Sequence, residues 1–168
     1  MSFVDSAGAA PTPVGNPRGT LESIRAAADP GIKLDLTVTR PQLTIGRDLL
    51  DFSVSSQRDG YLYLLHVASD GKFYVLFPNK LDSNNYLKAG STQRFPRPAW
   101  GIQAQGPAGT SYVMAYLSET PKAFTKDLLV EGPFASGIAN SDTTRTLGVV
   151  ALTGRFGASA VAAIQEVK

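Results

Sequence analysis

The residues with the most obvious capacity for chemistry in this 168-residue sequence are one histidine, His66, and fourteen carboxylates. A catalytic histidine needs a nucleophile or an acid within hydrogen-bond reach, and usually an orienting carboxylate. The sequence around His66 supplies neither, so we expect a core or edge histidine. The sequence has no cysteine, which excludes thiol nucleophiles, disulfides and Cys-ligated metals, and a single histidine excludes sites that need two imidazoles.

The carboxylates offer a second route to chemistry, because most glycoside hydrolases use a pair of them. Here they are scattered singly through predicted strands and turns, with no local pair. A fold can bring two distant acids together, so a carboxylate-dependent glycan hydrolase, or a glycan-binding domain of the cell envelope, is the alternative function. The residues favour a protein without enzymatic activity, catalytic residues, bound metal or cofactor.

One glycine-rich segment invites comparison with a phosphate-binding loop. Gly101 and Gly106 have the spacing of that motif, but Pro107 replaces its lysine and removes an N–H donor. A strand is predicted to follow, so no helix N-terminus would face an anion. We therefore predict a structural turn at 106–110.

An oxygen-rich loop follows the most apolar part of the sequence. It contains Asn79, Asp82, Asn84 and Asn85, of which only Asp82 is a carboxylate. Calcium usually takes about six to eight oxygen ligands, several of them carboxylates. Side-chain to backbone hydrogen bonds of the Asx-turn type are the favoured interpretation of this loop.

Aromatic residues crowd the segment just before that loop. Exposed aromatic rings on a sheet can stack on single-stranded nucleic acid or carbohydrate, but nucleic-acid binding also needs interleaved basic residues. Only Lys72 flanks the set closely, and the net charge is just +2, so we expect core packing and no nucleic-acid partner. The candidate binding residues, if any of these side chains is exposed, are Tyr61, Tyr63, Tyr74, Asn79, Asp82, Asn85 and Trp100.

The periodicity of apolar residues predicts the elements that position these side chains. The apolar residues within 20–28 recur at helical spacing, and Asp29-Pro30-Gly31 is predicted to end this helix. Alternation with a period of two then predicts strands, of which a hairpin around Asp70-Gly71 is the clearest. Residues 119–141 lack a clear period and are predicted to be a surface excursion. The expected strands are 32–38, 43–45, 50–54, 61–68, 72–77, 91–95, 101–104, 111–118 and 158–167, with a short helix within 143–152.

Short strands separated by turns predict an all-β fold with minor α content, an antiparallel β-sandwich of about seven to nine strands with one or two short helices. Both hairpin strands are apolar on both faces, so the hairpin is expected to lie centrally, with helix 20–28 packed at an edge. Residues 1–19 are predicted to be a flexible linker or tail and residues 20–168 a single domain.

The order of features between Leu43 and Ser118 resembles that of the bacterial DUF4384 domain family. The features are Asp59–Leu65, the Asp70-Gly71 turn, Leu76-Phe77-Pro78-Asn79, the Asn-rich loop leading to Ala89-Gly90, Phe95-Pro96 and Gly106–Thr110, with Phe156-Gly157-Ala158 similar to the closing region. The resemblance implies a non-catalytic, β-rich accessory domain attached to other modules, notably serine/threonine kinases and caspase-like peptidases.

The biological setting is predicted from this resemblance and from the Ala/Pro/Gly-rich segment 6–19. We expect a sensory, scaffolding or protein-interaction module, the C-terminal domain of a larger bacterial signalling protein such as a membrane-anchored serine/threonine kinase. The expected partner is a protein or another domain of the parent chain, and a periplasmic location is favoured. No apolar run approaches the ~20 residues that span a bilayer, so we predict no membrane insertion of this segment.

Overall fold

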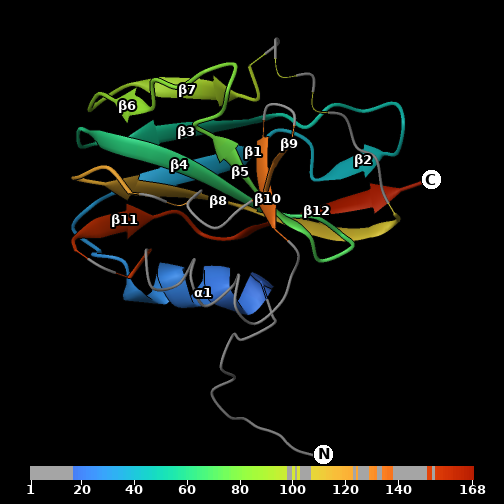
Figure 1. Cartoon of the computed structure of the whole chain (residues 1–168), viewed down its shortest axis with the longest axis horizontal. Coiled ribbons are helices and arrows are strands. Elements are labelled where there is room, and N and C mark those ends of the chain that lie inside the picture. Colours follow the sequence, from blue (N-terminus) through green and yellow to red (C-terminus); the bar gives the residue numbers. More distant parts are fainter. Residues whose placement is uncertain are drawn as a thin grey trace, which may run out of the picture.

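Two stacked β-sheets and one helix form the part of the chain that the computed structural model describes (Figure 1). That part comprises residues 17–97, 100, 102, 107–122, 124, 129–131, 134–137, 151–152 and 154–168. Its elements are α1 (Pro17–Ala27), β1 (Leu34–Val38), β2 (Gln42–Thr44), β3 (Phe52–Ser56), β4 (Gly60–Val67), β5 (Phe73–Phe77), β6 (Tyr86–Leu87), β7 (Thr92–Phe95), β8 (Gly109–Ser118), β9 (Leu129–Glu131), β10 (Phe134–Gly137), β11 (Phe156–Ala158) and β12 (Ala162–Val167).

The larger sheet has nine strands and is organised around β4. Its order is β2-β12-β8-β4-β5-β10-β9, with β6 also paired to β4 and β11 to β8. β4 is antiparallel to both β8 and β5. Alternate β4 side chains are buried on opposite faces, Leu62 and Leu64 on one and Tyr63 and Leu65 on the other. The central position predicted for the hairpin from its doubly apolar strands is therefore confirmed.

The smaller sheet, β1-β3-β7, covers one face of the larger sheet. Its buried residues Phe52, Val54 and Phe95 share one hydrophobic core with Leu62 and Leu64 of β4. This is the sandwich arrangement expected from the sequence, and the all-β fold class is confirmed.

Helix α1 covers the opposite face of the larger sheet, where Leu21 and Ile24 are fully buried against Tyr63 and Leu65 (Figure 1). The expectation of a helix at an edge of the sandwich was wrong. A helix with two buried positions one turn apart needs a flat apolar surface, which the second face of β4 and β8 provides. As predicted, the chain leaves the helix at Asp29, whose Oδ1 accepts a hydrogen bond from the Gly31 amide at 2.7 Å.

Two described parts of the segment predicted to be a surface excursion, 119–141, instead extend the larger sheet. β10 pairs with β5 through Ala135 and Val75, and β9 pairs with β10. These strands have only four and three residues, too few to establish a period in the sequence. With other short strands they raise the number among the described residues to twelve, above the expected seven to nine. Most of the strand predicted at 101–104 and of the helix predicted at 143–152 lies outside the described residues.

Candidate ligand-binding groove

A groove of about 380 Å³ opens between the loop after β5 and strand β7. This volume lies near the lower end of the range for small-ligand sites, roughly 300–1,000 Å³. Polar side chains dominate its walls. The lining residues are Leu62, Phe77, Asp82, Asn84, Asn85, Tyr86, Leu87, Lys88, Ser91, Gln93, Phe95 and Arg97.

Arg97 covers the aromatic floor of this groove. Its guanidinium carbon lies 5.2 Å from the ring centroid of Phe95 and 5.7 Å from that of Phe77. Both rings also pack against Trp100, with centroid separations of 5.7 and 5.4 Å respectively. Cation–π attraction and the surrounding rings therefore fix the position of the arginine head group.

Asp82 supplies the negative charge opposite Arg97. Its Oδ2 lies 3.2 Å from Arg97 Nε, close enough for an ion pair, although Nε is buried without an aligned hydrogen bond. A terminal guanidinium nitrogen of Arg97 donates a long hydrogen bond of 3.5 Å to Gln93. Asp82 is the one carboxylate among the lining residues, and a cation already faces it.

Asn79 shapes the loop that carries Asp82. Its Nδ2 donates to the Leu76 carbonyl at 2.8 Å, while its Oδ1 accepts from the amides of Leu81 and Asp82 at 2.8 and 2.9 Å. This buried Asn79 has the Asx-turn role predicted from the sequence, and it positions Asp82 rather than contacting a ligand.

Asn85 and Tyr86 form the opposite wall. Asn85 Nδ2 donates to the Leu62 carbonyl at 2.9 Å, and the Leu62 amide donates back to the Asn85 carbonyl at 2.8 Å. Tyr86 is 46% exposed, and its ring meets the Tyr61 ring edge-on at 5.3 Å. The loop is thereby anchored to β4 while one aromatic ring faces solvent.

The structure thus separates the seven candidate binding residues that the sequence indicated. Asp82 and Asn85 line the groove, whereas Tyr61 packs on the other face of β4, beside Tyr86. Tyr63 and Trp100 are buried in the two cores, where neither ring is accessible to a ligand. Tyr74 packs beside His66, and Asn79 is the structural asparagine described above.

Arg97 and Tyr86 were missed as candidates. Arg97 lies between two prolines in the sequence. Its place in the groove depends on its contact with Phe77, which lies twenty residues earlier, and no local sequence pattern indicates that contact. Tyr86 directly follows the polar residues Ser83, Asn84 and Asn85. An aromatic residue in a polar loop tends to be exposed, and this was the signal in the sequence that could have indicated Tyr86.

His66 lies on β4, half-buried beside Tyr74 and outside the groove lining. Burial lowers its pKa from 6.5 to about 4, an effect that the Asp70 charge partly opposes. In this environment the imidazole is neutral at pH 7, in keeping with the expected core or edge histidine.

We expect acidification from pH 6.5 to 4 to destabilise the protein through His66. The unfolded chain takes up the imidazole proton near pH 6.5 and the folded chain only near pH 4, so the unfolded state binds more protons across this window. The free energy of unfolding then falls by up to about 1.4 kcal/mol per pH unit. Urea unfolding of the wild type and His66→Gln at several pH values measures the difference in slope.

Comparison of the two chains separates His66 from the carboxylates. Hydrogen bonds lower the pKa of Asp29, of Asp48 and of Asp51, so their contribution to stability is lost from about pH 5 downward. Both chains contain these carboxylates, so the difference in slope reports on His66. Equal slopes for wild type and His66→Gln between pH 6.5 and 4 would contradict the assignment of a half-buried imidazole that stays neutral in this range.

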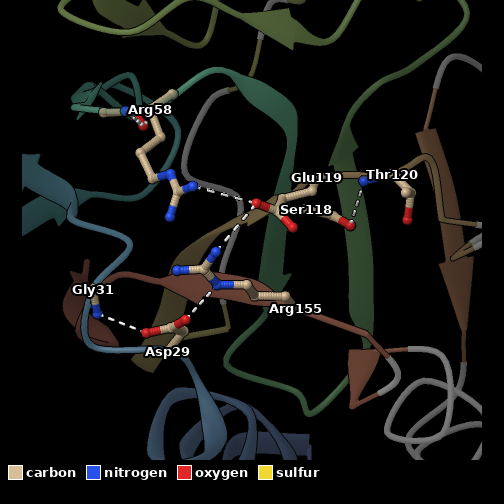
Figure 2. Close-up of polar contacts among 8 residues, drawn as sticks. Asp29, Gly31, Arg58, Ser118, Glu119, Thr120 and Arg155 are labelled. Carbon is tan, nitrogen blue, oxygen red and sulfur yellow. Dashed lines mark hydrogen bonds and ion pairs between the residues drawn. The ribbon is translucent and has the colours of Figure 1, made fainter.

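A second polar cluster connects the ends of four elements (Figure 2). Arg155 pairs with Asp29, and both Arg155 and Arg58 pair with Glu119 at 3.6 and 3.4 Å. The hydrogen bond from Arg155 is the main cause that lowers the pKa of Asp29. These charges satisfy one another and are exposed, so the cluster joins the end of α1 to the sheet rather than forming a binding site.

Among the residues that the structure describes, no group of three or more His, Asp or Glu side chains could hold a metal ion. None of the helical residues that the structure describes belongs to a helix long and apolar enough to cross a membrane.

Comparison with known proteins identifies one family. Residues 42–121 match the model of a domain of unknown function, DUF4384, which confirms the resemblance indicated by the order of motifs. The match runs from β2 to just beyond β8 and contains every residue that lines the groove. Residues 156–158, also similar to that family, lie outside the match. No curated protein and no solved structure matches the chain.

Proposed function

Since residues 42–121 match the DUF4384 family, we propose that this chain is a non-catalytic recognition module of a larger bacterial signalling protein, and that it binds its ligand in the groove over Arg97. The observation that carries the proposal is the pairing of Asp82 with Arg97 in that groove. The site presents fixed polar side chains to a ligand, while its carboxylate is already engaged.

The same observation disfavours a glycan hydrolase. Paired-acid glycosidases place two carboxyl groups roughly 5–10 Å apart across the scissile bond. Among the residues that line the groove, Asp82 has no second carboxylate beside it, and the Arg97 guanidinium occupies the position of a partner.

Attachment to a signalling protein is the further part of this proposal. It is supported by the resemblance, which implies accessory domains beside serine/threonine kinases or caspase-like peptidases. We place the domain in the periplasm, as the part of a membrane-anchored kinase that meets a partner protein or an envelope ligand.

Affinity capture from bacterial lysate and envelope fractions tests the recognition role. The baits are the wild type, the groove variant Tyr86→Ala/Lys88→Gln, and Leu49→Ala as a control that removes another exposed apolar side chain. We expect mass spectrometry to find a molecule retained by the wild type and Leu49→Ala and lost with the groove variant.

Two results would count against the proposal. Equal capture by all three baits would show that recognition does not use the groove. Release of reducing sugar from envelope glycans by the wild type, abolished by Asp82→Asn, would make the chain an enzyme.

A further inference from the structure

Arg97 and Asp82 present two opposite charges to the groove that both residues line. Arg97 Nε lies 3.2 Å from Asp82 Oδ2, so the positive and the negative group are neighbours. The two side chains are only partly buried, with 39% of Arg97 and 22% of Asp82 exposed. A ligand in the groove therefore meets both charges at one point.

This charge pair uses little of its hydrogen-bonding capacity. A guanidinium has five N–H donors, and an ionised carboxylate accepts through two oxygens. In the part of the chain that the structure describes, Arg97 donates one hydrogen bond from its side chain, the 3.5 Å bond to Gln93. Its Nε is buried and donates none, and the carboxylate of Asp82 is paired with Arg97 by charge alone. Most of the terminal N–H groups of Arg97 and the carboxylate oxygens of Asp82 are thus left for a ligand.

Two amide side chains line the same groove, Asn85 beside β6 and Gln93 on β7. Asn85 donates its Nδ2 to the Leu62 carbonyl, and over the described residues its Oδ1 accepts no hydrogen bond. Gln93 accepts the bond from Arg97 through its oxygen, and its own amide nitrogen donates to none of the described residues. The walls therefore offer one acceptor and one donor in addition to the charge pair.

A ligand with a single charge fits this pair poorly. An anion that is attracted by Arg97 is repelled by Asp82, and a cation meets the reverse combination. A neutral ligand forms only the weaker, uncharged type of hydrogen bond with these groups. A small ligand that holds an ammonium and a carboxylate on one carbon atom matches both charges at once.

From these features, and resting on the proposed recognition function, we infer that the ligand is a free α-amino acid zwitterion with an uncharged polar side chain. Its carboxylate accepts from the terminal nitrogens of Arg97, and its ammonium donates to Asp82. An amide side chain, such as that of glutamine, donates to Asn85 and accepts from Gln93. A large apolar side chain gains little, because the apolar residues of the lining are at most 4% exposed: Leu62, Phe77, Leu87 and Phe95.

Isothermal titration of the full chain at pH 7 tests this inference with four probes. These are L-glutamine, its α-amide, which lacks the carboxylate charge, N-acetyl-L-glutamine, which lacks the ammonium charge, and L-leucine. We expect L-glutamine to bind most tightly. Each blocked derivative should bind at least about tenfold more weakly, equivalent to about 1.4 kcal/mol, because one charge of the pair is left without its partner.

Two variants assign the ends of the ligand. Asp82→Asn should weaken the binding of L-glutamine about tenfold and leave that of N-acetyl-L-glutamine unchanged, since the acetylated compound has no ammonium group. Arg97→Lys keeps the positive charge but loses the paired donors of the guanidinium, so it should weaken both of these carboxylates and leave the α-amide unchanged. Asp35→Asn is the matched control, because it removes an exposed carboxylate of β1 that does not line the groove.

The comparison of the four probes on the wild type does not depend on any variant being folded. No binding of L-glutamine, equal affinity for L-glutamine and its two blocked derivatives, or tighter binding of L-leucine would overturn the inference. Unchanged affinity for L-glutamine in folded Asp82→Asn and Arg97→Lys would also overturn it. Groove-dependent capture alongside such a result would leave the recognition function standing, whereas conversion of bound L-glutamine into another compound would support the ligand and overturn the non-catalytic function.

Discussion

Phe95→Ala is expected to lower the free energy of unfolding by about 3–5 kcal/mol, the range for truncating a buried aromatic residue. The Phe95 ring is fully buried and packs against Phe52, Phe77 and Trp100, with centroids 5.3–6.1 Å away. Its removal opens a cavity where β7 meets the larger sheet. Domains of this kind are stable by roughly 5–15 kcal/mol, so the loss is a large part of the total.

Urea unfolding followed by tryptophan fluorescence measures this effect, because Trp100 lies beside the lost ring. Leu49→Ala is the control, since an exposed leucine should change stability by no more than about 0.5 kcal/mol. Phe95→Ala also removes one of the two rings beneath Arg97. Ligand binding in the groove should therefore weaken even at temperatures where the Phe95→Ala chain remains folded. If Phe95→Ala lowers the free energy of unfolding by less than about 1 kcal/mol, the packing of β7 against the larger sheet is contradicted.

Gly157→Ala is the second large effect that we expect. A Cβ at position 157 would lie 2.8 Å from both the Cβ and the carbonyl oxygen of Ile32, closer than non-bonded atoms tolerate. Neither atom is the flexible end of a side chain, so the backbones of β11 and of the segment before β1 must move apart. Overpacking of this kind costs typically about 1–3 kcal/mol.

A double-mutant cycle with Ile32→Ala tests whether this contact is the cause. Ile32→Ala removes Cγ2, the atom nearest to the added methyl group, and should reduce the cost of Gly157→Ala. Thermal unfolding of the two single variants and the double variant gives the coupling energy. Strictly additive effects would show that the strain arises elsewhere.

The sequence predicted the central hairpin because its signals are local. Asp70-Gly71 specifies the turn, and apolar side chains at successive positions of 61–67 require a strand covered on both faces. The turn role of Asn79 was predictable for the same reason, since its bonds reach only Leu76, Leu81 and Asp82.

The remaining features depend on contacts between distant parts of the chain. The position of α1 on a sheet face follows from the buried side chains of β4 and β8, not from the helix itself. Likewise, the groove depends on Arg97 reaching back to Phe77 and Asp82, which are separated from it by β6 and β7. Composition and spacing carry no record of such pairings.

The central claim is that the groove over Arg97 binds a ligand and leaves it chemically unchanged. The most direct measurement records the amide spectrum of the ¹⁵N-labelled chain during titration with a soluble digest of bacterial cell envelope, together with the spectrum of the digest over time. We predict that the amide shifts concentrate at residues 82–97 and that no new product signals form in the digest. Shifts centred on another surface, or the growth of product signals that Asp82→Asn abolishes, would contradict the account.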